Sequence, residues 1–264
     1  MDLSDRVALV TGAGRGIGRG IALVMARHGA HVVVADLRRE DAATVAAEVQ
    51  ALGRRAVALA LDVTDDASIA AAVDEALDRM GRIDVLVNNA GIYAAPGWEE
   101  RDRFTDEDWD LLYRVNVRGV ARVTDAVAPH MKERRYGKVV NIASGAGREG
   151  SPDNPPYAIS KAGVISLTQA QAKELAPFDV NVNCICPGLL WTPMWEKIAY
   201  RRRRLEGREV SPRRYFEELV ARTVPLGREQ TPEDIGYLAA FLASDYARNI
   251  TGQAINVNGG SRMN

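Results

Sequence analysis

Tyr157 and Lys161 have the i, i+4 spacing within the stretch Pro-Pro-Tyr-Ala-Ile-Ser-Lys, and Ser144 precedes them. If residues 156–175 form a helix, the phenol and the ammonium lie on one face of it. A free tyrosine has a pKa near ~10 and is a poor base at neutral pH, but a cation beside it favours the phenolate. The trio is therefore a candidate for moving a proton on and off a substrate oxygen.

Such a pair is equally well explained as the start of an amphipathic helix, so the surrounding elements must decide. Ser144 ends the apolar run 138–144, which predicts a position at the C-terminal edge of a strand. Ligands of open α/β sheets bind at that edge.

Apolar runs alternate with helical patterns along the whole chain, which predicts a parallel sheet covered by helices on both faces. Strands are expected at Arg6–Val10, His31–Ala35, Ala56–Leu61, Val85–Val87, Lys138–Ala143, Val180–Ile185 and Ala254–Val257. Helices are expected at Ile17–His28, Arg39–Leu52, Asp65–Met80, 106–133 (interrupted or bent near Gly119 and Pro129), Tyr157–Leu175 and Thr231–Ala243. The prediction is one doubly wound α/β domain over 1–264, with a sheet of about seven strands.

The composition is that of an ordinary globular protein, with 47% hydrophobic and 26% charged residues in 264. The net charge of −1 argues against nucleic acid as the main partner. The acidic start Met1–Arg6 does not resemble a signal peptide. Because no apolar stretch approaches the roughly 18 residues that a membrane span needs, a cytoplasmic protein without a membrane partner is expected.

The only cysteines, Cys184 and Cys186, are expected to be buried thiols that face opposite sides of one strand and do not pair. Their spacing does not suit zinc and the three histidines are scattered, so no metal is predicted.

The first strand leads into the turn 11–18, Thr-Gly-Ala-Gly-Arg-Gly-Ile-Gly, which differs in spacing from G-x-G-x-x-G. Glycines let the backbone approach a pyrophosphate, and the following helix offers free N–H groups. Asp36 ends the second strand, where a carboxylate can accept hydrogen bonds from an adenosine ribose and repel a 2′-phosphate. Its alternative role is to cap the next helix.

Taken together, the motifs resemble the short-chain dehydrogenase/reductase family over essentially the whole chain. The matching segments are 11–18, 61–63, 88–91, 115–116, Ser144, 157–161, 187–188 with Thr192, and 251–252. The resemblance implies a Rossmann-like fold, a nicotinamide cofactor and a homotetramer built on two long helices. It also implies that Ser144 binds the substrate oxygen, that Tyr157 transfers its proton, that Lys161 holds the nicotinamide ribose and lowers the tyrosine pKa, and that Asn116 interrupts its helix and helps to hold a water.

The same resemblance assigns the remaining cofactor contacts, with Asp62 and Val63 at the adenine. They are Gly12, Arg15, Gly16, Ile17, Gly18, Asp36, Asp62, Val63, Asn89, Ala90, Gly91, Tyr157, Lys161, Pro187, Gly188, Leu190 and Thr192. Asp36 favours NAD as the cofactor, although Arg15, Arg38 and Arg39 are basic groups that could attract a 2′-phosphate.

The substrate pocket is expected to be walled by Tyr93, Trp98, residues 145–154 and the segment after Pro187. Trp191-Thr-Pro-Met-Trp195 resembles acetoin/diacetyl reductases and sugar-alcohol dehydrogenases, so a small polyol, sugar alcohol or hydroxyketone is the favoured substrate. A 3-oxoacyl-carrier-protein reductase is the enzyme alternative, and an NAD(H)-binding redox sensor is the non-enzyme alternative.

Residues 194–225 are expected to form a mobile helical lid with few core partners. The segment is basic and includes four consecutive arginines, 201–204. Successive helical residues are about 100° apart, so at most one or two of them can face one pocket. A solvated or intersubunit ion-pair surface is favoured over contact with an anionic substrate.

Overall fold

Valine and other apolar residues fill the strands, and the central strands are buried on both faces, as a parallel sheet between two helical layers requires. The computed structural model describes residues 1–263, and its sheet has the order β3-β2-β1-β4-β5-β6-β7 with every pair parallel. The strands are β1 (Val7–Thr11), β2 (His31–Asp36), β3 (Ala56–Ala60), β4 (Val85–Asn88), β5 (Gly137–Ile142), β6 (Val180–Pro187) and β7 (Ala254–Val257). The predicted sheet is confirmed.

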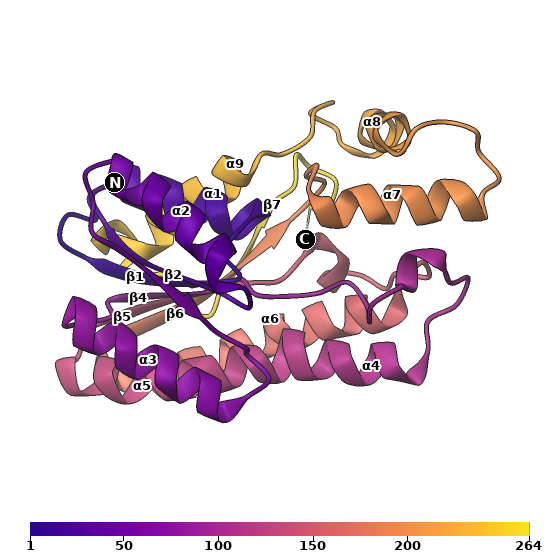
Figure 1. Ribbon diagram of the computed structural model, residues 1–264. Helices are drawn as coiled ribbons and strands as arrows, with labels where there is room; N and C mark the ends of the chain where they lie inside the picture. Colours follow the sequence, from indigo (N-terminus) through magenta and orange to yellow (C-terminus); the bar gives the residue numbers. More distant parts are fainter. Residues whose placement is uncertain (264) are drawn as a thin grey trace.

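Helices cover both faces of the sheet (Figure 1). One layer contains α1 (Gly16–Arg27), α2 (Arg39–Ala51) and α9 (Pro232–Ala243). The other contains α3 (Asp66–Met80), α5 (Gly119–Arg134) and α6 (Pro155–Leu175), with α4 (Asp106–Leu112) packed along α6. Two further helices, α7 (Pro193–Leu205) and α8 (Pro212–Thr223), lie beyond the carboxyl ends of the strands. Short 3-10 turns occur at Trp98–Glu100, Gly145–Gly147, Ala176–Phe178 and Asp245–Ala247.

The strand β1 shows how the core is divided. Its side chains alternate, so that Ala8 and Val10 pack under α1 and α9 while Val7 and Leu9 pack against the α3–α5 side. The strand order also reverses at β1, because the chain first runs outward to β3 and then returns to place β4 on the other side. That reversal opens a crevice at the carboxyl ends of β1 and β4.

The long helical segment predicted at 106–133 is interrupted by a π-helical turn at Tyr113–Arg118. The expected interruption near Gly119 is confirmed, since that glycine begins α5. Pro129 lies inside α5 without ending it. Within residues 1–263, no helix has both the length and the apolar character needed to cross a bilayer.

The two cysteines are buried and unpaired. They share one hydrophobic cluster with Val120, Ala143 and Val164. The expectation that Cys184 and Cys186 face opposite sides of the strand is wrong, because strand side chains repeat every two residues and positions i and i+2 share a face.

The segment predicted as a lid is helical, but the expectation of few core partners is wrong. Phe216 is fully buried and packs against two tryptophans, in a tilted contact with Trp191 and an edge-on contact with Trp195, with ring centroids 5.2 and 5.3 Å apart. Arg201, which is 6% exposed, donates to the backbone carbonyls of Arg101 and Asp102 at 2.8 and 2.7 Å. The helices α7 and α8 therefore have an apolar core of their own and a polar attachment to the 101–102 loop.

Candidate active site

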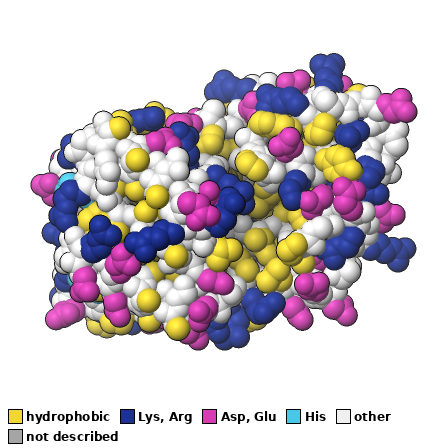
Figure 2. Space-filling view, in the orientation of Figure 1, with side chains coloured by type: hydrophobic (Ala, Val, Ile, Leu, Met, Phe, Trp, Pro, Cys, Tyr) yellow, Lys and Arg dark blue, Asp and Glu magenta, His cyan; other side chains and the backbone are white. Residues whose placement is uncertain are grey.

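A cavity of about 310 Å³ opens at the carboxyl ends of the central strands, beneath α7 and α8. Figure 2 shows hydrophobic side chains in a hollow between these helices and the rest of the molecule, with basic side chains at its edge. Residues predicted from distant motifs meet here. They are Ile17, Ser144, Tyr157, Pro187, Gly188, Leu190 and Thr192.

Aromatic side chains form one wall of this cavity. Tyr93 lines it, with its ring centroid 5.0 Å from that of Tyr157 and 4.6 Å from that of Trp98. Trp195 lines the cavity as well, whereas Trp98 and Trp191 lie behind the wall in hydrophobic clusters. Of the three tryptophans considered for the pocket, Trp195 alone faces it.

Tyr157 lies in the first turn of α6 with its hydroxyl beside that of Ser144. Burial raises the pKa of Tyr157 to about 12, although a hydrogen bond from Ser144 acts in the opposite direction. The expected lowering of this pKa by Lys161 is not found, because desolvation of the phenolate outweighs the nearby groups. In this arrangement Tyr157 is a protonated phenol at neutral pH.

Lys161 lies one helical turn after Tyr157 and is 5% exposed. Its Nζ atom donates to the carbonyl of Ile142 at 2.9 Å and lies 5.8 Å from the centroid of the tyrosine ring. Burial lowers the pKa of Lys161 to about 8. The ammonium is thus held behind the phenol at the end of β5.

Asn116 occupies the π-helical turn, which aims its side chain inward. Its Oδ1 atom accepts from the amide of Ile92 at 2.9 Å, and its Nδ2 atom donates to the carbonyl of Ile92 and to Ser160, both at 3.0 Å. A Cβ atom on Gly91 would lie 3.2 Å from this Oδ1 and 3.3 Å from Nζ of Lys161. Gly91 therefore allows the amide and the ammonium to approach each other.

Asn154 is a site residue that the sequence reasoning placed only in a general pocket wall. It is 2% exposed and caps α6, accepting from the amide of Tyr157 at 3.1 Å. Its Nδ2 atom also donates to the carbonyl of Tyr93 at 2.9 Å. The Asn-Pro-Pro sequence is a cap signal that could have identified the first contact.

The glycine turn between β1 and α1 fits a dinucleotide pyrophosphate. Gly12 and Gly16 have φ angles of 60° and 55°, a region that side chains rarely adopt. A Cβ on Gly12 would stand 2.8 Å from Cα of Ala90. Arg15, the N-cap of α1, makes no side-chain cap bond. The first amides of α1 are thus left for an anionic ligand.

Asp36 reaches back to the glycine turn. Its carboxylate accepts from the amide of Gly14 at 2.9 Å, and Arg38 rather than Asp36 occupies the N-cap position of α2. The capping alternative is therefore not what the structure shows. Arg38 pairs with Asp41, and Arg39 lies 3.5 Å from Glu75. Two of the three basic groups that could attract a 2′-phosphate, Arg38 and Arg39, therefore already have acidic partners.

Asn89 ties the turn to β4 by donating to the carbonyls of Thr11 and Gly12 at 3.0 and 2.9 Å. The hydroxyl of Thr11 accepts from the amides of Asn89 and Ala90, both at 3.0 Å. Thr11 is a supporting residue that the predicted set lacks.

Asp62 and Val63 follow β3, two strands away from β1, and do not line the cavity. The carboxylate of Asp62 accepts from the amide and hydroxyl of Thr64 at 2.8 and 2.7 Å. Val63 packs against α5, where a Cβ on Gly119 would meet its side chain. Both positions follow β3, which lies on the same side of β1 as β2 with Asp36 at its end.

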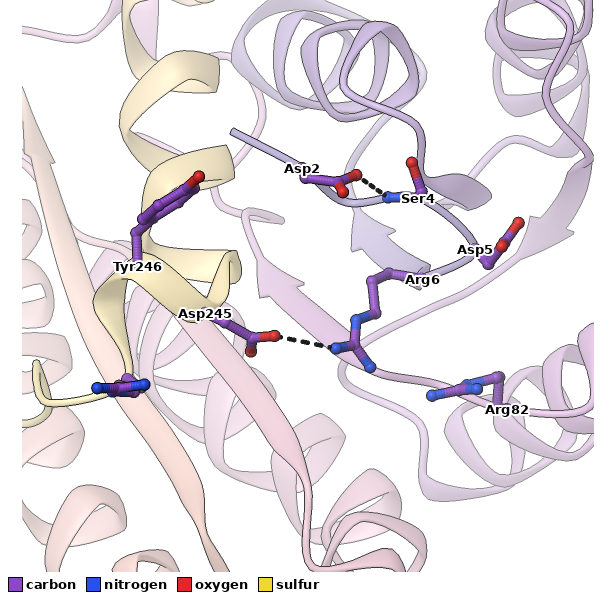
Figure 3. Close-up of a pocket in the computed structure, with 8 residues that line it drawn as sticks. Asp2, Ser4, Asp5, Arg6, Arg82, Asp245 and Tyr246 are labelled. Atoms are coloured by element: carbon purple, nitrogen blue, oxygen red, sulfur yellow. Dashed lines mark hydrogen bonds and ion pairs between the residues drawn. The ribbon is translucent and has the colours of Figure 1, made fainter.

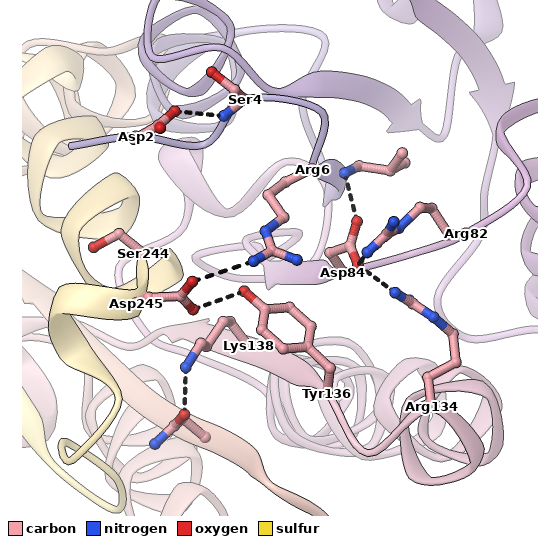
Figure 4. Close-up of polar contacts among 12 residues, drawn as sticks. Asp2, Ser4, Arg6, Arg82, Asp84, Arg134, Tyr136, Lys138, Ser244 and Asp245 are labelled. Carbon is pink, nitrogen blue, oxygen red and sulfur yellow. Dashed lines mark hydrogen bonds and ion pairs between the residues drawn. The ribbon is translucent and has the colours of Figure 1, made fainter.

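A larger hollow of about 440 Å³ lies at the opposite edge of the sheet, where β1 and β4 begin (Figure 3). Its lining carries three acidic and three basic side chains, and Arg6 pairs with Asp245 at 3.2 Å. Beside it Asp84 binds Arg82 and Arg134, as Figure 4 shows. Two of the residues predicted to be catalytic, Ser144 and Tyr157, line the smaller cavity at the other edge of the sheet. Residues 1–263 contain no cluster of three histidine, cysteine or acidic side chains suited to a metal.

Several known proteins are similar to this chain over nearly its whole length. The family described as enoyl-(acyl carrier protein) reductase matches residues 12–262. The chain is 39% identical to the 3-oxoacyl-(acyl-carrier-protein) reductase FabG of Thermotoga maritima, covering 98% of this chain and 99% of that protein. It is 42% identical to a sorbitol dehydrogenase of Cereibacter sphaeroides over the full length of both. The crystal structure of levodione reductase superposes with a TM-score of 0.89 at 33% identity, covering 97% of each chain.

Proposed function

The chain belongs to the short-chain dehydrogenase/reductase family of oxidoreductases, and we propose that it transfers a hydride between NAD(H) and a secondary alcohol or ketone. The substrate class is a small polyol, sugar alcohol or hydroxyketone. The observation that carries the proposal is the meeting of Ser144 and Tyr157 with Ile17 of the glycine turn in one cavity.

The nicotinamide, when bound, supplies or accepts the hydride. In ketone reduction Tyr157 donates its phenolic proton to the substrate oxygen, and in alcohol oxidation it takes that proton. Ser144 holds the same oxygen by a hydrogen bond and orients it toward the phenol. Lys161 contributes positive charge behind the phenol and binds the nicotinamide ribose, while Asn116 holds the inner end of the proton path.

NAD is favoured over NADP by the acidic side chain at the end of β2. A 2′-phosphate beside Asp36 would place two negative groups together. Arg38 and Arg39 offer little compensation, since each already pairs with a carboxylate. Arg15, in the glycine turn, is exposed and is the third basic group that could attract a 2′-phosphate.

A small substrate is supported by the size and the aromatic wall of the cavity. Tyr93 and Trp195 offer apolar faces, while Ser144 and Tyr157 supply the polar end. The likeness to sorbitol dehydrogenase agrees with a polyol. The likeness to a 3-oxoacyl-carrier-protein reductase keeps that ketoreductase activity as the second candidate.

We also propose a cytoplasmic homotetramer in which the α4–α6 face forms an interface between subunits. Large apolar side chains are exposed there, with Trp109 at 42%, Tyr113 at 56% and Ile159 at 59%. Apolar side chains gathered on one helical face commonly mark an association surface. Light scattering of the purified protein would give the number of subunits.

The deciding experiment follows reduced-nicotinamide absorbance with NAD or NADP against secondary alcohols, polyols and small diketones. Turnover of polyols or hydroxyketones with NAD supports the proposal. Turnover confined to 3-oxoacyl thioesters favours the second candidate. Tight NAD binding without any turnover would favour a redox sensor. A sensor would not need the Ser144–Tyr157 pair, because it transfers no proton to a substrate.

A further inference from the structure

Most basic residues of α7 are engaged away from the cavity. Arg201 donates to the carbonyls of Arg101 and Asp102, and Arg204 lies 2.9 Å from the carboxylate of Asp102. Arg203 stacks over the ring of Tyr200. Among the described residues of this helix, Arg202 is the basic side chain that lines the cavity.

Arg202 uses one of the two nitrogen atoms on the Nε–Nη2 edge of its guanidinium group. Its Nη2 atom lies 3.0 Å from Oδ2 of Asp153. Its Nε atom is buried, and no described residue accepts a hydrogen bond from it. A carboxylate binds an arginine best through two parallel hydrogen bonds. The pair with Asp153 is therefore made through one nitrogen of the Nε–Nη2 edge, and the Nε donor is left without an acceptor.

Asp153 is a replaceable partner. Its side chain is 57% exposed against 22% for Arg202, and the pair lies at the rim of the cavity. Ion pairs with an exposed carboxylate contribute little to stability. A ligand carboxylate that also reaches Nε can displace Asp153, because it satisfies a buried donor that Asp153 leaves unpaired.

The neighbours of Arg202 connect it to the proposed reaction centre. Its guanidinium lies over the ring of Trp195 at 5.5 Å and close enough to Tyr93 to oppose the rise in that phenol's pKa that burial causes. Tyr93 in turn packs at 5.0 Å against Tyr157. One aromatic ring therefore separates the arginine from the phenol, a span that a small substrate can bridge.

Arg262 is the other cation of the cavity, and it pairs with Glu149. It lies beside Gly145, next to Ser144, rather than on the aromatic wall. Two acidic residues of one loop, Glu149 and Asp153, and two basic residues, Arg202 and Arg262, line the cavity. Its charges therefore balance when no anionic ligand is bound. If a substrate carboxylate displaces Asp153, Arg202 is still paired with an anion, and Arg262 is still paired with Glu149.

From these contacts we infer that Arg202 is a specificity-determining residue that binds a carboxylate on the substrate, at the end remote from the reacting carbinol. The inference rests on the proposed hydride transfer to or from a secondary alcohol or ketone, and it changes the expected substrate from a neutral polyol or hydroxyketone to a hydroxy acid or the corresponding oxo acid. A phosphate monoester offers similar oxygens, and the experiment separates the two anions.

The experiment compares straight-chain hydroxy acids that carry a secondary hydroxyl, each with its own amide and with a phosphate ester of similar length. The proteins are the parent, Arg202→Gln, Asp153→Asn and the control Arg203→Gln. Arg203 is matched because it lies on the same helix, stacks on an aromatic ring and also has an unpartnered Nε atom, but does not line the cavity.

We expect the parent to prefer at least one acid over its amide. Arg202→Gln should lower kcat/KM for that acid by about tenfold or more through KM, and leave the amide little changed. Asp153→Asn should lower KM for the acid, because the competing carboxylate is removed. Arg203→Gln should match the parent with both.

Three results would overturn the inference. The first is equal use of acid and amide by the parent, and the second is a loss of similar size for both in Arg202→Gln. The third is a shared loss in Arg202→Gln and Asp153→Asn, which would identify the pair as a structural latch. If the parent prefers the phosphate ester, the substrate group that Arg202 binds is a phosphate and not a carboxylate. If no alcohol of any charge were oxidised, the proposed function itself would fail.

Discussion

Oδ1 of Asn154 accepts a hydrogen bond from the backbone amide of Tyr157 at 3.1 Å, so a buried side chain fixes the start of the helix that carries the phenol. The same side chain donates from Nδ2 to the carbonyl of Tyr93, on the facing wall of the cavity. One amide thus sets the distance between the proton-transferring group and the aromatic wall. Asn154 acts as a positioning residue.

Replacing Asn154 separates these two contacts. Asn154→Ala removes both and should lower the free energy of unfolding by about 1–2 kcal/mol, the usual range for a lost helix cap. Asn154→Ser keeps a side-chain acceptor for the Tyr157 amide and should retain most of that stability while losing the bond to Tyr93. Urea unfolding and kcat are the measurements. Equal destabilisation by the two variants would contradict a role in capping.

Tyr157→Phe should nearly abolish turnover and leave NAD affinity little changed. The substitution removes the hydroxyl but keeps the ring that packs on Tyr93, so the loss should appear in kcat, by on the order of 10² to 10⁴. NAD titration monitors the cofactor site. Tyr246→Phe is the control, because Tyr246 is 76% exposed and lies at the opposite edge of the sheet. Residual activity within about tenfold of the parent would remove Tyr157 from its role.

The raised pKa of Tyr157 predicts different pH profiles for the two directions of the reaction. At pH values below its pKa of about 12, Tyr157 is a neutral phenol, which is the form that donates a proton to a ketone. Oxidation needs the phenolate, whose fraction rises about tenfold per pH unit below that pKa. Between about pH 6 and 8, kcat/KM for oxidation should therefore increase while that for reduction stays level. A level oxidation profile would show that the working phenol is already ionised there.

Asp36→Asn should improve the use of NADP relative to NAD, because it removes the charge that opposes a 2′-phosphate. The amide oxygen can still accept from Gly14. Asp36→Ala should shift the ratio in the same direction and also loosen the glycine turn, since the bond to Gly14 is lost. Ratios of kcat/KM for the two cofactors test this. Unchanged ratios in both variants would show that Asp36 does not determine the preference between NAD and NADP.

The α7–α8 segment is predicted to close over the bound substrate and exclude water. The turn at Leu205–Gly207 is exposed, and trypsin cleavage within 199–214 should slow when NAD and substrate are both present. Arg201→Gln should speed cleavage, because it removes the attachment of α7 to the 101–102 loop. Equal cleavage with and without ligands would make the segment a fixed insertion rather than a lid.

The sequence by itself determined the order of the strands and helices, the glycine turn with Asp36 at the end of β2, and the shared face of Tyr157 and Lys161. These are local properties. The periodicity of apolar residues fixes which face is buried, glycine permits backbone angles that other residues rarely adopt, and i, i+4 positions meet on any helix.

Only the tertiary structure decided the electrostatics of the site and the contacts across it. The pKa of Tyr157 rises instead of falling because burial depends on every element packed around the phenol, and the spacing to Lys161 does not report that burial. The four consecutive arginines are alike as a sequence, but the packing of α7 turns Arg202 toward the cavity and Arg201 toward the 101–102 loop. Desolvation and long-range contact are properties of the packed molecule, which no local pattern encodes.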